Sequence, residues 1–576
     1  MSCARSISRT ISTTSLLSQT SSHRFPKTSI VRLCPTDVLR PSSSLGMSSS
    51  AAAAAPPTSP LIVNGNGSDH DLLKHVFPWE RREYLVEKTA RKLERSSEAV
   101  EKLKLIDDIQ RLGIGYYFED VINAQLHLQC SAFSTEEDLF TTALRFRLLR
   151  HNGFQINPEV FVKFKDRNGN FKQSLGGDTL GLVSLYEASK MGGRGEEILE
   201  EAMEFSECRL KRDELVARSL EVPRHRRMAR LEARRFIEEC TAANHHINDG
   251  VLELAILDYN QVQNHHQMEL AEITRWWKEL GLVEKLSFAR DRPLECFLWT
   301  VGLLPEPKYS RCRIEAAKAV SILLVIDDIF DIYGKMDELI LFTHAIRRWD
   351  LEAMESLPEY MKICYMALYN TTNEICYKVL KESGRNPLPY LKSTWIDMIE
   401  CSMTEAKWFN GGGSAPKLEE YIENGVSTAG AYMALVHLFF LIGEGVTHQN
   451  AQLFTQKPYP NLFSAAGRIL RLWDDLGTSK EEQERGDLAS SIHLFMKENK
   501  LSTEEEARSG VLEEISRLWK DLNGELISNN NEMPLPMIKV ALNMARASQV
   551  VYNHQQDTYF SSVDNYVEAL FFTPLN

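Results

Sequence analysis

The chain has 576 residues, 43% of them hydrophobic and 25% charged, which is typical of a globular protein with room for at least two hydrophobic cores. Its 66 Lys and Arg residues and 79 Asp and Glu residues give a net charge of -13, and no Lys/Arg-rich run alternates with aromatic residues, so we expect no nucleic-acid partner. No apolar run approaches the roughly 20 residues of a membrane span, so we expect a soluble protein with no membrane partner.

Residues 1–60 differ from the rest of the chain in composition. Six basic residues face the single acid Asp37 in a background rich in Ser and Thr, which gives this segment a net charge of +5 and residues 61–576 a net charge of -18. A segment rich in Arg and Ser, poor in acids and without a continuous apolar core is typical of an organelle transit peptide. We predict a leader to the plastid, or secondarily to the mitochondrion. The alternative is a cytosolic protein, which a start at Met47 would also give.

From Asp71 onward the sequence predicts one helix after another. Residues 82–93, 99–112 and 226–240 place apolar side chains at positions i, i+3, i+4 and i+7, and alternating strand patterns are nearly absent. We therefore predict an all-α protein. The polar segment 241–250 separates charged helices from a more aromatic half, so we expect two helical domains, residues 61–248 and 249–576.

The strongest chemical signal follows five consecutive apolar residues and reads Asp327-Asp328-Ile-Phe-Asp331. On an α-helix, Asp327 and Asp331 lie one turn apart on one face. Two such carboxylates repel each other unless a cation lies between them, and an oxygen-only site selects a hard ion such as Mg²⁺ or Mn²⁺, which also binds phosphate. The alternative is a solvated acidic helix end.

A second acidic stripe has the same chemistry. Asp474, Thr478 and Glu482 are spaced i, i+4 and i+8, so one helix face offers two carboxylates and a hydroxyl to a metal. Two such walls facing each other would hold several divalent ions, which suits a diphosphate ligand.

Arginines are expected to complete a diphosphate site, because their planar donors bind phosphate in a bidentate manner. Arg290 and Arg292 lie on a predicted loop just before a proline, and Arg471 lies one helical turn before Asp474. Taken alone, the Arg290–Arg292 pair would more often be a solvated surface.

The carbon part of a substrate requires aromatic walls, since aromatic faces stabilise cations. Each candidate could equally be an ordinary core residue: Trp299, Phe330, Tyr333, Tyr552 and Tyr559. Residues 427–430, Ser-Thr-Ala-Gly, are expected to interrupt an apolar helix beside the pocket. The neighbouring histidines at 245–246 and 265–266 diverge by about 100° on a helix, so we expect surface residues and no chelated metal.

Together these motifs resemble those of the plant class I terpene synthases. Residues 327–331 resemble the family's DDxxD motif, the stripe from Asp474 to Glu482 its NSE/DTE motif, and residues 290–292 its RxR motif, in the family's order, and the similarity covers the chain after the leader. The resemblance implies an N-terminal relict α-barrel domain and a C-terminal catalytic isoprenoid-synthase bundle. No DxDD motif of the class II reaction is present.

The same resemblance implies the roles of the site residues. Three residues would be catalytic, namely Asp327, Asp331 and Arg290. A prenyl diphosphate, geranyl or farnesyl, would contact Arg290, Arg292, Asp327, Asp331, Arg471, Asp474, Trp299 and Tyr552. Three Mg²⁺ ions, or Mn²⁺ as a substitute, would bind Asp327, Asp331, Asp474, Thr478 and Glu482.

One departure from the family pattern concerns the product. Many plastid monoterpene synthases carry two arginines followed after eight residues by Trp, whereas here Trp79 precedes Arg81-Arg82 and no Trp follows at that spacing. Members without this motif tend to release acyclic alcohols. The resemblance thus implies linalool from geranyl diphosphate, with nerolidol from farnesyl diphosphate or geraniol from geranyl diphosphate as alternatives. We expect a monomer. A chain-elongating prenyltransferase, which usually has two DDxxD motifs, and a non-enzymatic helical scaffold are the rival readings.

Overall fold

The computed structural model describes residues 78–96, 98–211, 220, 222–242, 249–410, 416–485, 490–528, 533–552 and 563–576. Residues Arg82–Asn576 belong to one compact unit. Apart from one isolated antiparallel bridge between Lys165 and Phe171, its described regular structure is helical, which confirms the predicted all-α class. The predicted leader lies outside the described residues, as does the predicted boundary near residue 248, and so the division into two domains stays a prediction.

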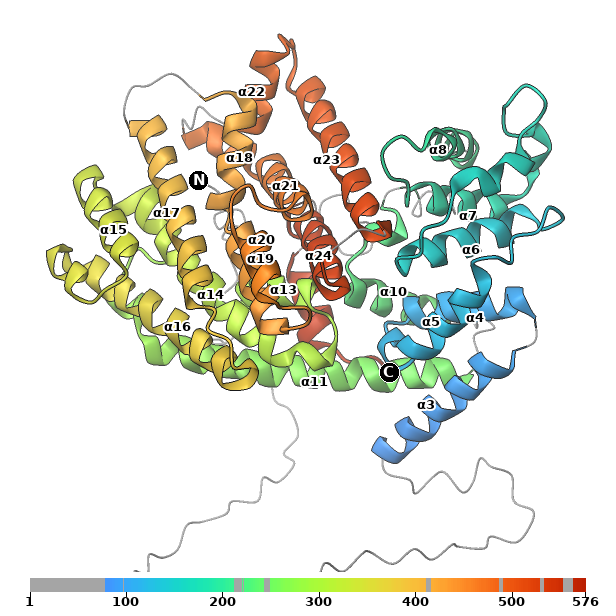
Figure 1. Ribbon diagram of the computed structural model, residues 1–576, viewed down its shortest axis with the longest axis horizontal. Coiled ribbons are helices and arrows are strands. Elements are labelled where there is room, and N and C mark those ends of the chain that lie inside the picture. The colour runs from blue at the N-terminus through green and yellow to red at the C-terminus, as the bar shows by residue number, and fades with distance from the viewer. Residues whose placement is uncertain are drawn as a thin grey trace, which may run out of the picture. The chain divides into compact units, whose positions relative to one another are not determined.

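The helices of the N-terminal part bury their apolar residues mainly in one hydrophobic core, with a small separate cluster between α7 and α8. Their bounds are α3 (Pro78–Arg95), α4 (Ala99–Arg111), α5 (Glu119–Gln129), α6 (Leu139–His151), α7 (Thr179–Ser189), α8 (Glu197–Leu210) and α10 (Ala229–Ala242), with the short 3-10 turn η5 (Arg224–Arg226) before α10. The predicted helix 82–93 lies within α3, and the predicted helix 99–112 coincides with α4 to within one residue. The predicted helix 226–240 corresponds to α10, which begins three residues later than expected, at Ala229. Figure 1 shows α10 beside the long helix α11 (Asp249–Leu280), against which it packs.

The C-terminal helices enclose a second, larger core. After α11 they are α12 (Leu282–Lys285), α13 (Pro293–Leu303), α14 (Ser310–Asp328), the π-helix η7 (Ile329–Tyr333), α15 (Met336–Arg348), α16 (Glu359–Ser383), α17 (Leu388–Asn410), α18 (Leu418–Thr428), α19 (Ala431–Ile442), α20 (His448–Thr455), α21 (Asn461–Arg485), α22 (Ser491–Glu498), α23 (Glu504–Ile527), α24 (Leu535–Tyr552), α25 (Val563–Val567) and η10 (Glu568–Phe572). Five of these, α13, α14, α19, α21 and α24, form a closed ring in which each helix packs against the next. This ring positions the site described below.

The predicted interruption at residues 427–430 is confirmed. Helix α18 ends at Thr428, α19 begins at Ala431, and the two axes are bent by 42°. Gly430 makes the bend possible, because its φ of +74° is left-handed and a Cβ there would lie 2.1 Å from Cδ1 of Leu323 on α14. Helix α19 can therefore approach α14 closely.

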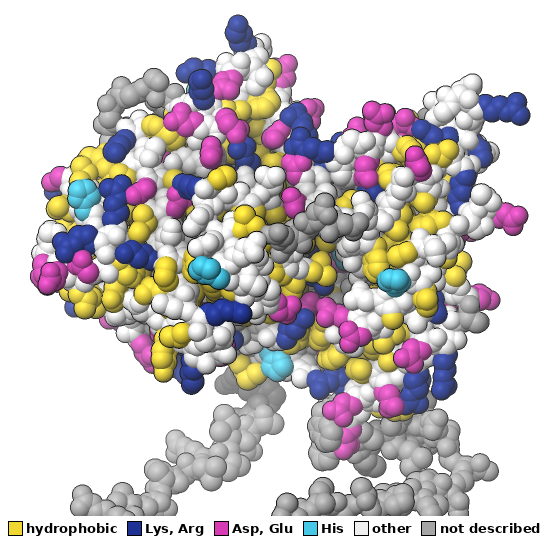
Figure 2. Space-filling view, viewed as in Figure 1, with side chains coloured by type: hydrophobic (Ala, Val, Ile, Leu, Met, Phe, Trp, Pro, Cys, Tyr) yellow, Lys and Arg dark blue, Asp and Glu magenta, His cyan; other side chains and the backbone are white. Residues whose placement is uncertain are grey.

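Among the described helices, no single one has both the length and the apolar composition to cross a membrane. Only α18 and α19, which are bent at their junction, reach that length and composition when they are counted together. Figure 2 shows basic and acidic side chains interspersed with apolar ones over the face that it draws.

Candidate active site

The first acidic wall lies where α14 ends. Its last apolar turn is buried, as the sequence predicted, and Asp328 is fully buried, whereas the side chain of Asp327 keeps 16% of its exposure. Asp331 lies one turn further along, within η7. The sequence analysis assumed a continuous α-helix here; the π-helix changes the angular spacing of Asp327 and Asp331, and such π-turns often occur at functional sites.

Arg290 pairs with two carboxylates of this wall. Its Nη2 lies 2.7 Å from Oδ2 of Asp327, its Nε lies 2.7 Å from Oδ1 of Asp328, and its backbone N–H donates to Oδ2 of Asp328 at 3.0 Å. Burial raises the pKa of Asp328, against the opposing effect of Arg290. Burial lowers the pKa of Arg290, but the two carboxylates outweigh it and the net shift is upward, so the guanidinium stays charged.

The loop that carries Arg290 and Arg292 is fixed between two helices. Asp291 accepts a hydrogen bond from Nε1 of Trp277 on α11 at 2.9 Å, and Pro293 begins α13, where its missing N–H costs nothing. Arg292 lies 3.4 Å from the carboxylate of Glu295. Burial raises the pKa of Glu295 to about 7. The sequence analysis missed the Trp277 contact, because it joins segments of no recognisable motif.

The second acidic wall lies on α21, where Asp474, Asp475 and Thr478 are buried. Arg471 lies 2.7 Å from Oδ1 of Asp475 and 3.5 Å from Oδ2 of Asp474. Its pKa is raised well above the ordinary value, because the two carboxylates outweigh the opposing effect of burial. Thr478 Oγ1 donates to the backbone carbonyl of Asp474 at 2.9 Å. The side chain of Glu482 lies outside the described residues.

Asp475 connects this wall to two neighbouring helices. Its Oδ1 accepts from the hydroxyl of Tyr421 at 3.2 Å, and its Oδ2 accepts from the backbone N–H of Ser491 at 2.8 Å. Tyr421 also accepts a hydrogen bond from Arg471. Asp475 thus joins α18, α21 and α22, and Asp474 is the member of the pair that matches the predicted metal ligand.

An apolar cavity lies inside the five-helix ring, and none of its lining residues in the described chain is charged. It is lined by Cys296, Trp299, Thr300, Leu303, Ala316, Val320, Leu323, Leu324, Ala429, Gly430, Ala431, Ala434, Leu438, Leu470 and Met544. Leu324 lies three residues before Asp327, and Leu470 lies four residues before Asp474. Both acidic walls are therefore within about one helical turn of lining residues of the cavity.

The aromatic candidates divide between cavity and core. Trp299 lines the cavity, and its ring centroid lies 6.0 Å from that of buried Tyr552. Phe330 is instead buried against Phe342, and half-exposed Tyr333 stacks on Phe288, so neither lines the cavity. Tyr559 lies outside the described residues.

The histidine pairs also differ from one another. His245 and His246 lie outside the described residues. His266 was expected at the surface, but it is buried between the rings of Phe297 and Phe571, with centroids 6.0 and 5.9 Å away. The sequence analysis was wrong here because it did not foresee that the C-terminal segment covers α11.

The donor set fits divalent metal and diphosphate together. The side chains offered by the two walls are carboxylates and a hydroxyl, the ligands that Mg²⁺ prefers. Across the described part of the chain, no group of three His, Cys, Asp or Glu residues is clustered tightly enough to hold an ion alone. An ion here would then need ligand oxygens or water, as Mg²⁺ commonly does. Arg290 Nη1 is buried and has no hydrogen-bond partner among the described residues, which fits an incoming anion.

Known proteins resemble this chain in sequence. Residues 278–521 match the terpene synthase family, metal binding domain, and residues 69–230 match the terpene synthase, N-terminal domain. The chain is 73% identical over 529 residues to the chloroplastic geraniol synthase of Ocimum basilicum, covering 90% of this chain and 92% of that protein. It is 67% identical over 590 residues to the chloroplastic R-linalool synthase of Ocimum basilicum, covering 100% of both.

A solved structure supports the same relationship. Isoprene synthase from grey poplar leaves (Populus x canescens), in complex with three Mg²⁺ ions and dimethylallyl-S-thiolodiphosphate, has a TM-score of 0.81 at 38% identity, covering 89% of this chain and 99% of that chain. The chain belongs to the terpene synthase family. Within it, the chain is a class I enzyme of the plant monoterpene synthase subfamily. This confirms the family that the acidic motifs predicted.

Proposed function

We propose that the enzyme ionises geranyl diphosphate and captures the cation with water to form the acyclic alcohol geraniol. The observation that carries this proposal is the apolar cavity, free of charged lining residues, that leads to two oxygen-rich walls and two arginines. Higher identity to the geraniol synthase than to the R-linalool synthase supports geraniol over linalool, the product implied by the sequence motifs. Both relatives are named for monoterpene alcohols, which favours geranyl diphosphate over farnesyl diphosphate as the substrate.

The metal ions would be held by the predicted oxygen ligands, Asp327, Asp331, Asp474, Thr478 and Glu482. When bound, three Mg²⁺ ions, as in the isoprene synthase complex, would neutralise the diphosphate and make it a better leaving group. Arg290 binds a diphosphate oxygen through its Nη1, and Arg292 closes the same side. Arg471 holds Asp474 and Asp475 in place, so its main role is positioning, with a diphosphate contact also proposed.

The reaction breaks the bond between C1 and the diphosphate oxygen, and the electron pair leaves with the diphosphate. The apolar cavity holds the allylic chain, and the aromatic faces of Trp299 and Tyr552 stabilise its charge. A water oxygen then bonds to C1, and its proton passes to the released diphosphate, which gives geraniol. Attack of the same water at C3 would give linalool, which is the second candidate because the R-linalool synthase matches the chain along its whole length.

The location and assembly of the enzyme complete the proposal. The acid-poor leader of residues 1–60 directs the chain to the plastid, in line with two relatives that are named chloroplastic. The mature enzyme comprises an N-terminal domain of residues 61–248 and a catalytic domain of residues 249–576. It works as a monomer.

A product assay tests the proposal. The full chain and the chain without residues 1–60 are incubated with Mg²⁺ and either geranyl or farnesyl diphosphate, and products are identified by chiral gas chromatography with mass spectrometry. We expect geraniol from geranyl diphosphate. Predominant linalool would select the second candidate, cyclic hydrocarbons would overturn the acyclic-alcohol proposal, and absence of turnover with both substrates would overturn the activity.

A further inference from the structure

A second cavity, remote in sequence from the acidic motifs, lies between the N-terminal and C-terminal halves of the compact unit. Its lining comes from α4, α6, η5 and α10 on one side, and from residues before α14, the end of α23 and helix α24 on the other. We call it the interhalf cavity. None of its lining residues lines the apolar cavity.

Cations outnumber carboxylates in the lining of the interhalf cavity. Three carboxylates, those of Asp107, Glu232 and Glu306, face six cations. The cations are Arg111, Arg147, Arg224, Arg227, Lys539 and Arg546. The lining therefore carries an excess of positive charge, in a protein whose residues 61–576 are strongly acidic.

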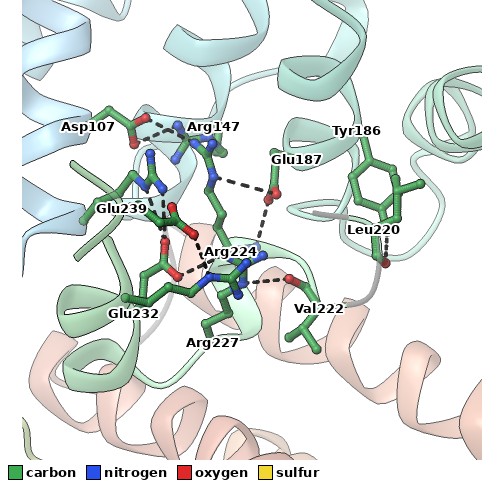
Figure 3. Close-up of polar contacts among 12 residues, drawn as sticks. Asp107, Arg147, Tyr186, Glu187, Leu220, Val222, Arg224, Arg227, Glu232 and Glu239 are labelled. Carbon is green, nitrogen blue, oxygen red and sulfur yellow. Dashed lines mark hydrogen bonds and ion pairs between the residues drawn. The ribbon is translucent and has the colours of Figure 1, made fainter. Parts of the chain in front are cut away.

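The carboxylates are already engaged by four of the arginines. Asp107 lies 2.8 Å from Arg147 and 3.4 Å from Arg224, which also reaches Glu187 at 3.9 Å, as Figure 3 shows. Glu232 pairs in the same way with Arg227 at 2.9 Å and with Arg111 at 3.4 Å. Glu306 lies 3.0 Å from Lys308. The acids are thus used locally, and Lys539 pairs with Glu119, outside the lining, at 3.5 Å. Arg546 is then the lining cation with no carboxylate partner among the described residues.

Arg546 on α24 carries that uncompensated charge. Its Nε donates to the backbone carbonyl of His225 at 2.6 Å and its Nη1 to Oδ1 of Asn543 at 2.7 Å, both of which are neutral. No carboxylate among the described residues forms an ion pair with Arg546, and burial lowers its pKa to about 10. Arg546 is partly buried, and a partly buried guanidinium held by neutral dipoles alone gains from a counter-ion.

His225 adds unfilled hydrogen-bonding capacity to the same cavity. Its side chain is only 5% exposed, its ring lies edge-on to Trp519 at 5.5 Å, and neither ring nitrogen has a hydrogen-bond partner within the described chain. Nε of buried Arg147, across the cavity, also has no partner there. Buried polar atoms are rarely left unpaired, so two independent residues indicate that the cavity receives a polar ligand.

We propose that the interhalf cavity binds a small phosphate-type oxyanion, with Arg546 as its main cation and His225 and Arg147 as further donors. Orthophosphate and inorganic diphosphate share this chemistry. The anion joins both halves, because its partners come from η5, α6 and α24. The anion would also be linked to the apolar cavity through α24, because Arg546 of this helix lines the interhalf cavity and Met544 lines the apolar cavity. The assignment does not depend on the identity of the terpene product.

Calorimetry on the full chain in EDTA tests this site, because chelation of divalent ions prevents metal-dependent diphosphate binding at the acidic walls. Orthophosphate and diphosphate are titrated in separate arms. We expect saturable binding of one anion per chain in at least one arm, and the arm with the higher affinity identifies the ligand. Arg546→Gln should weaken binding at least about tenfold, as expected for loss of a charge-assisted hydrogen bond. Arg290→Gln, at the acidic wall, should leave it unchanged.

Arg517→Gln is the matched surface control, since Arg517 is exposed and pairs with Glu514 on α23. If Arg546→Gln does not fold, His225→Ala replaces it, since this variant keeps all six cations and is expected to weaken binding several-fold. In addition, the anion should raise the melting temperature of the wild-type chain. Absence of saturable binding in both arms would overturn the proposal. Binding that Arg290→Gln removes and Arg546→Gln retains would overturn it as well.

Discussion

Replacing Arg290 with Gln should destabilise the metal-free enzyme, and the loss should depend on pH. The change removes two ion-pair contacts of 2.7 Å and leaves the carboxylate of Asp328 buried with one backbone N–H donor at 3.0 Å. Breaking a buried pair by removing one partner costs about 3–5 kcal/mol. Because Arg290 keeps 10% of its exposure and Asp327 keeps 16%, we expect about 2–4 kcal/mol at pH 8.

The sign of the pH dependence follows from Asp328. Burial already raises its pKa in the folded enzyme, and loss of the Arg290 charge must raise it further. A folded state with the higher pKa binds more protons than the unfolded state, so stability falls as pH rises through that pKa. Protonation of Asp328 at low pH removes the unpaired charge. The loss caused by Arg290→Gln should therefore be smaller at pH 5 than at pH 8.

Urea unfolding in EDTA at pH 5 and pH 8, followed by circular dichroism, measures both effects. The double variant Arg290→Gln/Asp328→Asn is the control, because it removes the cation and the buried charge together and should recover most of the stability at pH 8. An equal loss at both pH values, or no recovery in the double variant, would refute the reasoning. Turnover of geranyl diphosphate should stay impaired even in the double variant, since the Nη1 donor is still missing.

Three further predictions concern the ring of helices and the acidic walls. Gly430→Ala should lower the free energy of unfolding by about 2–4 kcal/mol, because left-handed backbone strain adds to a contact of 2.1 Å with Leu323. The control is Gly384→Ala, at φ +70° with open space around it, which should cost only the strain, about 1 kcal/mol. Equal losses in the two variants would exclude the clash. Asp327→Asn should reduce kcat at least about 10²-fold while the chain stays folded in EDTA, with a melting temperature lowered only by loss of the ion pair with Arg290; retained turnover would remove Asp327 from the proposed metal site. EDTA should abolish turnover and added Mg²⁺ or Mn²⁺ should restore it, whereas activity that survives EDTA would contradict a metal-dependent ionisation.

Much of the site could be predicted from local spacing, and the rest could not because it depends on contacts between distant segments. Five apolar residues before Asp327 indicate a buried helix, and this turn of α14 is buried. The loop that carries Arg290 is held by Trp277, fourteen residues before Asp291, and no spacing rule connects them. A helical wheel also assigns no role to Asp328 and Asp475, the second aspartate of each pair, although each accepts a hydrogen bond from a backbone N–H group.

That second aspartate gives the two walls a common design. At each wall one arginine contacts both members of an Asp-Asp pair: Arg290 binds Asp327 and Asp328, and Arg471 binds Asp474 and Asp475. The second aspartate also accepts a backbone N–H, from Arg290 in one wall and from Ser491 in the other. If the first aspartate bound a metal ion as proposed, an arginine fixed on the second would keep its place, because its anchor would remain. The net charge of -18 on residues 61–576 is therefore compatible with a polyanionic substrate, since the arginines at the walls are already fixed where its charge would lie.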